Sequence, residues 1–293
     1  MNTERVRNNE KLILDEAFKT AMQAAIKASD EVLKYWPAHT NPHFDRERVL
    51  EIIGKEEGTG NYATIADLEA EKIIIDAIKA NPLFTTHAII AEESDIVEGS
   101  SGKKWVIDPI DGTGAFRHGL VDFGINIGLI DGQNPAMGVI ALPAYRLLIG
   151  AVSGKGAHLY DFEGNTLADL TEQNKAINED TKEMLVAYDT GYVNRGDHLT
   201  NYAAKIADKI GYPISYASCA AGNFRLAQGS LAAYFLPNPK IFDIAAPAAI
   251  ISEIGGKVTN IKGGAIDWDS KNLSYLAARN PQIHGTILEM FES

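Results

Sequence analysis

The spacing of apolar residues in the first part of the chain predicts two amphipathic helices. From about Glu10 to Trp36, apolar residues recur every three or four positions, which is the period of a helix with one buried face. A second helix is predicted from about Ile65 to Ala80, because Asn81-Pro82 disfavours further helical backbone.

The pattern then changes to short apolar runs and to alternation of apolar with small residues. Both are typical of β-strands. Turn residues such as Asp131-Gly132 and Glu163-Gly164-Asn165 separate these runs, so this part predicts a meander of neighbouring strands. The predicted strands are His87–Ala91, Trp105–Ile107, Phe123–Leu129, Ala136–Leu142 and Leu147–Val152.

From about Met184 onward, short strands are expected to alternate with helices. Gly256 is placed to supply a left-handed cap after the third of these helices, and Asn280-Pro281 can open a last helix. The predicted strands are Met184–Tyr188, Ile214–Ala217 and Ala232–Leu236, and the predicted helices are His198–Ile210, Ala220–Gln228 and Ile244–Ile254.

Composition and charge narrow the functional class. Of the 293 residues, 45% are hydrophobic and 23% charged, as in globular proteins, and a net charge of −12 opposes binding to nucleic acid. No apolar run reaches the roughly 20 residues of a membrane span, and the first residues lack the apolar core of a signal peptide. Cys219 is the single cysteine, so a disulfide within the chain and a cysteine-based metal site are excluded. We expect a cytoplasmic protein without nucleic-acid or membrane partners.

The segment Trp105–Thr113 carries the most specific chemistry in the chain. An apolar strand delivers Asp108 and Asp111 to a tight turn, and Gly112 and Thr113 follow with backbone N–H groups and a hydroxyl. Converging carboxylates repel one another unless a cation compensates, and an all-oxygen ligand set favours a hard ion such as Mg²⁺. A metal beside backbone N–H groups suits a phosphate ester, so the segment predicts a metal-dependent phosphatase.

Three further acidic segments stand out, although each alone is more typical of a solvated helix face, a loop or a helix cap. They are Asp67 with Glu69 and Glu71, the pair Glu92-Glu93, and Asp243.

Three motifs in this order resemble the inositol monophosphatase family of Mg²⁺-dependent, lithium-sensitive phosphatases. The wider superfamily includes fructose-1,6-bisphosphatases and 3'(2'),5'-bisphosphate nucleotidases. The resemblance runs from about Asp67 to Gly256 and is carried by Ala91–Ser94, Trp105–Thr113 and Phe242–Ala246. It implies a layered α-β-α-β-α sandwich of α/β (α+β) class, two or three Mg²⁺ ions per site with Mn²⁺ as a substitute, a small phosphorylated metabolite as substrate, and a homodimer.

The resemblance also assigns site residues. Glu93 and Thr113 would orient the attacking water, with Asp67 as the partner of Thr113. We expect an N-terminal α+β half, residues 1–180, with the metal-binding motifs, and a C-terminal α/β half, residues 181–293, that completes the active site. The expected metal ligands are Glu93, Asp108, the carbonyl of Ile110, Asp111 and Asp243. The expected substrate-binding residues are Asp111, Gly112, Thr113, Ser218, Ala220 and Asp243.

The leading hypothesis is a Mg²⁺-dependent phosphomonoesterase that hydrolyses a small polyol or sugar phosphate by attack of a metal-activated water. Departures from the family pattern keep the substrate open. Leu236 stands where inositol-specific members carry an acid, and Phe123–Ile130 resembles the bisphosphate nucleotidases. The alternatives are therefore a 3'(2'),5'-bisphosphate nucleotidase and a fructose-1,6-bisphosphatase, and from a different class a catalytically inactive relative that acts as a binding protein.

Overall fold

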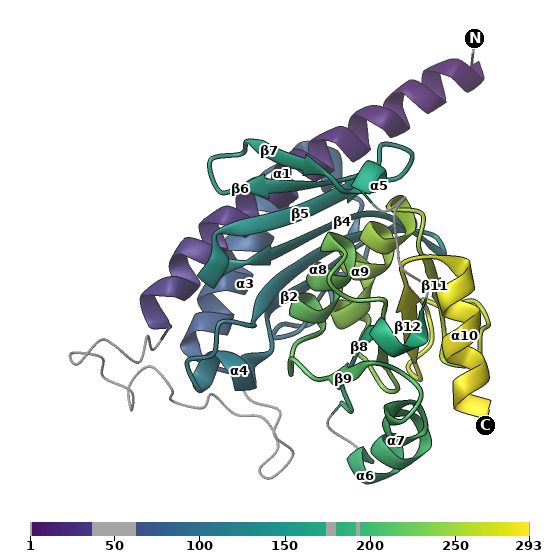
Figure 1. The fold of residues 1–293 in the computed structure, drawn as a ribbon. Coiled ribbons are helices and arrows are strands. Elements are labelled where there is room, and N and C mark those ends of the chain that lie inside the picture. The colour runs from purple at the N-terminus through teal and green to yellow at the C-terminus, as the bar shows by residue number, and fades with distance from the viewer. Residues whose placement is uncertain (1, 37–62, 174–179, 192–193, 293) are drawn as a thin grey trace.

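Two β-sheets alternate with three layers of helices, as Figure 1 shows for the computed structural model. It describes residues 2–36, 63–173, 180–191 and 194–292. Three clusters of buried apolar residues fill the spaces between the layers. The layered α-β-α-β-α sandwich predicted from the sequence is therefore confirmed.

The first outer layer consists of α1 (Asn2–Tyr35) and α3 (Ile65–Lys79), which pack against each other and against the first sheet. Small side chains such as Ala21 and Ala25 are fully buried on α1 and allow this close packing. The two predicted helices are thus present, but α1 begins at Asn2 rather than near Glu10, because helical backbone continues beyond the apolar stripe. After α3, Asn81 caps the short 3₁₀ helix η1 (Pro82–Phe84).

The first sheet has seven strands in sequence order, and only β1 and β2 run parallel. The rest form the antiparallel meander that the turn residues predicted. Short elements follow three of the strands: α4 (Thr113–Arg117), η2 (Pro143–Tyr145) and α5 (Leu170–Gln173). The strands are β1 (Ala88–Ala91), β2 (Lys103–Asp111), β3 (Gly124–Asp131), β4 (Asn134–Leu142), β5 (Leu147–Val152), β6 (Ala157–Asp161) and β7 (Thr166–Asp169).

The middle layer, α8 (Cys219–Gln228) and α9 (Ile241–Glu253), lies between the two sheets. Helix α9 approaches the first sheet closely because glycines face it. A Cβ atom on Gly138 would lie 2.3 Å from the backbone oxygen of Ala246. This close packing determines where the N-terminus of α9, with Asp243, lies relative to β2 and β3.

The second sheet has the order β11-β12-β10-β8-β9, and its far face is covered by α10 (Pro281–Glu292) and α7 (Ala204–Ala207). Asn280 caps α10 by accepting a hydrogen bond from the Ile283 N–H at 2.7 Å, as predicted. The strands are β8 (Leu185–Tyr188), β9 (Tyr212–Ile214), β10 (Ala233–Leu236), β11 (Lys257–Thr259) and β12 (Tyr275–Ala278), and the 3₁₀ helix η3 (Thr181–Glu183) precedes them.

Three local predictions for the second part of the chain need correction. The helix expected at 198–210 starts at α6 (Arg195–His198) and continues through the π-helical segment η4 (Leu199–Ala203) into α7. Strand β9 covers Tyr212–Ile214 and overlaps the expected strand Ile214–Ala217 only at Ile214; the left-handed φ of 55° at Ala217 does not fit a strand that extends to this residue. The left-handed residue after α9 is Gly255, with a φ of 81°, and not Gly256.

The predicted boundary at residue 180 falls between the last strand of the first sheet and the first strand of the second. Because α8 and α9 pack on both sheets, the division into two halves stays a prediction. In the part of the chain that the structure describes, none of the helices is long and apolar enough to span a membrane.

Candidate metal centre

Strand β2 carries two of the predicted ligands toward the middle helical layer. Trp105 and Ile107 face α1 and α3, so the alternate positions Val106 and Asp108 face α8 and α9. Both aspartates were expected after the strand, but β2 continues through Asp111. Its pairing with β3 shifts register between Asp108 and Asp111, and such a bulge can redirect a side chain.

Asp243 joins this pair from the first turn of α9. Its Oδ2 atom accepts a hydrogen bond from the Lys240 N–H at 2.6 Å, which holds the carboxylate at the N-terminus of the helix. Each of the three aspartates, Asp108, Asp111 and Asp243, contributes one carboxylate oxygen, and these three oxygens lie within 4.8 Å of one another. Three positions up to 135 residues apart in sequence therefore meet at one point.

The electrostatics of this triad fit a divalent cation. Burial raises the pKa of Asp108, Asp111 and Asp243, and the neighbouring carboxylates raise it further. The Oδ1 atom of Asp108 is buried without a hydrogen-bond partner. Buried polar atoms normally have partners, and clustered carboxylates need a compensating charge. An all-oxygen donor set of this kind suits a hard cation such as Mg²⁺.

Asp111 is held from the second part of the chain. The hydroxyl of Ser218 and the N–H of Ala220, at 2.9 Å, both donate to Asp111 Oδ1. Ser218 also caps α8, since its Oγ accepts the Ala221 N–H at 3.1 Å. Ser218 and Ala220 were expected to bind substrate. In the structure the Ser218 hydroxyl and the Ala220 N–H instead bind Asp111, a predicted metal ligand.

The turn after β2 packs closely on the same loop. Gly112 adopts a left-handed φ of 83° and precedes α4, and a Cβ atom there would lie 2.8 Å from the Cβ of Ser218. A larger residue at this position would push the loop away from Asp111. The turn therefore needs glycine for conformation and for space.

Thr113 and Asp67, two of the three predicted catalytic residues, lie together. The Thr113 hydroxyl is 3.4 Å from Asp67 Oδ1 and 3.0 Å from the carbonyl oxygen of Ile110. Asp67 also accepts hydrogen bonds from the N–H and hydroxyl of Thr64, and its burial raises its pKa to about 7. The Ile110 carbonyl, predicted as a metal ligand, is thus an acceptor of the Thr113 hydroxyl in this arrangement.

The structure does not bring Glu93, the third predicted catalytic residue and a predicted ligand, into the aspartate triad. Its N–H donates to Glu71 at 2.8 Å, and its charge, after that of Glu92, raises the pKa of Asp67. The neighbouring charge that raises the pKa of all three triad aspartates is Glu92. Ala91, the last residue of β1, pairs in parallel with Ile107, so Glu92 directly follows β1 where β2 reaches Asp108.

Asn126 and Asp189 are two polar residues near the triad that the sequence analysis did not single out. Asn126 is fully buried in β3 directly opposite Asp108, and its Oδ1 has no hydrogen-bond partner. Asp189 follows β8, and its charge raises the pKa of Asp111. A polar residue inside the apolar alternation of Phe123–Leu129 was the available signal for Asn126. No local pattern marked Asp189.

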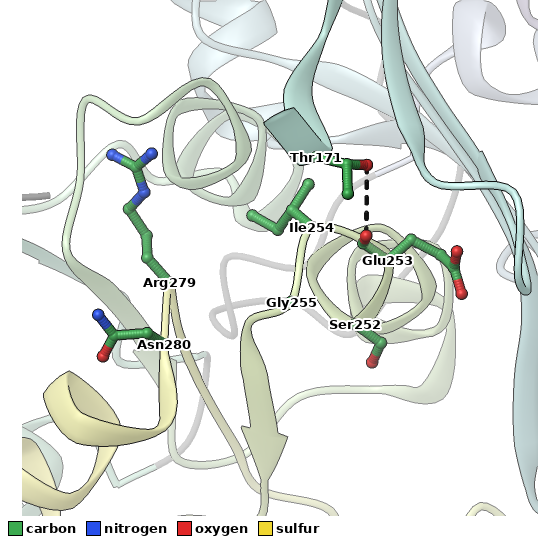
Figure 2. Close-up of a pocket in the computed structure, with 7 residues that line it drawn as sticks. All are labelled: Thr171, Ser252, Glu253, Ile254, Gly255, Arg279 and Asn280. Atoms are coloured by element: carbon green, nitrogen blue, oxygen red, sulfur yellow. Dashed lines mark hydrogen bonds between the residues drawn. The ribbon is translucent and has the colours of Figure 1, made fainter. Parts of the chain in front are cut away.

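A hollow at the other end of α9 is separate from the triad. It is lined by Thr171, Glu253 and Arg279 among others (Figure 2). Ten residues of helix, about 15 Å, separate Glu253 from Asp243. The Glu253 carboxylate accepts the N–H groups of Gly154 and Gly156 at 3.0 and 2.9 Å, so its polar atoms fasten α9 to the first sheet.

Comparison with known proteins identifies the family. The sequence model of the inositol monophosphatase family matches residues 13–293. The chain belongs to this family. An inositol-1-monophosphatase of Bacillus subtilis is 29% identical over 266 residues, which cover 89% of this chain and 96% of the relative. A fructose-1,6-bisphosphatase/inositol-1-monophosphatase of Thermotoga maritima is also 29% identical and covers 82% of this chain and 86% of the relative.

Solved structures agree with the fold of the inositol monophosphatase family. The crystal structure of the extragenic suppressor protein suhB from Bartonella henselae superposes with a TM-score of 0.77 at 22% identity, covering 95% of this chain and 99% of that one.

Family members are phosphatases that act on small phosphorylated compounds, so this protein is a phosphatase. The family is metal-dependent, and the aspartate triad is a group in this chain that could hold a metal ion.

Proposed function

We propose that this protein is a Mg²⁺-dependent phosphomonoesterase for a small polyol or sugar phosphate. The observation that carries the proposal is the convergence of Asp108, Asp111 and Asp243 within 4.8 Å. Asp108 Oδ1 lacks a protein partner, as expected of an oxygen that serves a cation. In this proposal the three aspartates hold the metal and Glu92, in place of Glu93, adds a fourth carboxylate from the residue after β1.

The roles of the remaining residues follow from their positions. A bound divalent cation would supply positive charge for the phosphoryl oxygens and lower the pKa of a water molecule. Thr113 would orient that water through its hydroxyl, and Asp67 would hold the hydroxyl in place from 3.4 Å. Gly112 and Thr113, at the start of α4, would direct backbone N–H groups toward the phosphate.

Phosphate release from a panel of substrates tests the proposal. The panel contains inositol monophosphate, fructose-1,6-bisphosphate and 3'-phosphoadenosine 5'-phosphate, each assayed with Mg²⁺ and with EDTA. We expect turnover of a polyol or sugar phosphate that requires Mg²⁺ and is lost in Asp108→Asn. Asp76→Asn is the matched control, because it removes one exposed carboxylate on α3. Undiminished turnover in EDTA would contradict the proposal.

The nucleotide belongs in the panel because of Leu236. The Leu236 side chain is almost completely buried in β10, in register with Tyr275. Because leucine is a hydrocarbon side chain, it offers no acceptor for a polyol hydroxyl. Preference for the nucleotide over both sugar substrates would replace the polyol proposal by a bisphosphate nucleotidase.

We also propose a homodimer without nucleic-acid partners. The net charge of −12 supports the second statement, because a phosphate backbone would be repelled. Light scattering of the purified protein measures the mass of the assembly, and a mass of one chain, 31.8 kDa, would contradict the dimer.

A further inference from the structure

Asp189 lies outside the metal centre, but its hydrogen bonds connect it to that centre. It follows strand β8, and its backbone N–H donates to the carbonyl of Phe235 in β10 at 3.1 Å. Its Oδ2 accepts the hydroxyl of fully buried Tyr234 at 2.9 Å. Asp189 therefore follows β8 directly and is hydrogen-bonded to the neighbouring strand β10 through both its backbone N–H and its carboxylate.

The other carboxylate oxygen holds a loop. Oδ1 of Asp189 accepts the Ser215 hydroxyl at 2.6 Å and the Ala217 N–H at 3.2 Å, and the N–H of Ser218 also donates to this carboxylate. We call residues 215–218 the 215–218 loop. It joins β9 to α8 and contains the left-handed Ala217, with a φ of 55°. An alanine rarely adopts this conformation unless surrounding contacts impose it.

The 215–218 loop ends at Ser218, which is hydrogen-bonded to the proposed metal ligand Asp111. Ser218 is the N-cap of α8, and its hydroxyl and the N–H of Ala220 both donate to Oδ1 of Asp111. Both bonds fall on one oxygen, so Oδ2 of Asp111 is the oxygen left for a cation. The orientation of Asp111 thus depends on the position of the loop.

We propose that Asp189 is a positioning residue for the metal centre, acting through the 215–218 loop to fix the orientation of Asp111. The chain of contacts runs from the second sheet through Asp189 and Ser218 to Asp111, which itself belongs to the first sheet. Residues that orient a metal ligand in this way typically change metal affinity by about 10- to 100-fold when they are replaced. The inference rests on the proposed metal-dependent function.

The test measures Mg²⁺ binding rather than turnover. Metal-free full-length protein is titrated with Mg²⁺ by calorimetry, and its thermal unfolding is recorded in parallel. Asp189→Asn should raise the Kd for Mg²⁺ about tenfold or more, because the neutral amide offers one accepting oxygen for donors that now share two carboxylate oxygens. Ser215→Ala, a milder change that removes one loop contact, should shift the Kd in the same direction by less.

A matched control and a rescue separate positioning from general destabilisation. Glu253→Gln alters a carboxylate that likewise accepts two backbone N–H groups of a loop, but at the far end of α9. It should lower the Tm and leave the Kd unchanged. Adding Ala217→Gly to Asp189→Asn should recover part of the affinity, because glycine adopts a positive φ without strain and needs less support from Asp189.

The outcomes distinguish this inference from the proposed function. An unchanged Kd in both Asp189→Asn and Ser215→Ala would overturn the positioning role while Mg²⁺ binding by the wild type stands. Equal weakening in Glu253→Gln, or a rescue variant no better than Asp189→Asn, would also overturn it. A wild-type protein that binds no Mg²⁺ would refute the metal centre itself and the inference with it.

Discussion

Replacement of Asp108 by asparagine tests the charge repulsion at the metal centre. The three aspartates present oxygens within 4.8 Å of one another. At an effective dielectric constant of about 20, each ionised pair at that distance costs about 3.5 kcal/mol. Asp108→Asn removes two of the three pairs, and the buried Asp108 Oδ1 has no hydrogen bond to lose. The metal-free variant should therefore be more stable than the metal-free wild type.

The size of the effect can be bounded. The aspartates lower the repulsion in metal-free protein by holding protons, as their raised pKa values indicate, so only part of it is recovered. We expect a gain of about 1 kcal/mol, or about 2–4 °C in Tm. Mg²⁺ at a hundredfold excess over its Kd should stabilise the wild type by about 2.7 kcal/mol. Asp108→Asn should lose most of this second gain.

Thermal unfolding followed by circular dichroism, with EDTA and then with excess Mg²⁺, measures both effects. Asp76→Asn is the control for the change in net charge, since its exposed carboxylate pairs with Lys72 on the surface of α3. The control should keep the full Mg²⁺ response. A lower Tm of Asp108→Asn in EDTA, or an undiminished Mg²⁺ response, would refute the reasoning. A wild type without any Mg²⁺ response would favour the alternative of an inactive binding protein.

Three further predictions concern pH, packing and a buried hydrogen bond. Burial raises the pKa of Asp67 from 3.8 to about 7, so the folded metal-free protein keeps a proton that the unfolded chain releases. The unfolding free energy in EDTA should fall by up to about 4 kcal/mol as pH rises from about 4 to about 7. In Asp67→Asn, the unfolding free energy measured with urea should change less with pH over this range. Gly138→Ala would set a Cβ 2.3 Å from the Ala246 oxygen and should cost about 3 kcal/mol or more in denaturant unfolding; an unchanged midpoint would contradict the close packing of α9. Tyr275→Phe removes the 2.9 Å hydrogen bond to buried Asn223 and should cost about 1–3 kcal/mol without altering Mg²⁺ affinity; a loss below that range would mean that Asn223 finds another partner.

Most of the regular elements and the chemistry of the central motif could be predicted from the amino-acid sequence alone. The spacing of apolar residues predicted the bounds of α3 and β5 to within one residue. This is possible because the buried face of a helix, or a buried strand, requires apolar residues at regular positions. Asp108 and Asp111 were recognisable because two acids at the end of an apolar strand are a local feature. Boundaries were less certain where polar residues continue a helix, as at the start of α1.

Which carboxylates lie close together depends on the packing of separate elements in the folded chain. Glu92 and Glu93 are adjacent and chemically equivalent, but of the two only Glu92 is among the charges that raise the pKa of Asp108, which supports the proposal of Glu92 as the fourth carboxylate. The convergence of Asp243 with Asp108 depends on how closely α9 packs against the glycines of the first sheet. Asp189 reaches the site through a loop from another sheet. The periodicity of apolar residues indicates which side of a single helix or strand is buried. A functional site depends on the distances between different elements, and those distances are set by their packing.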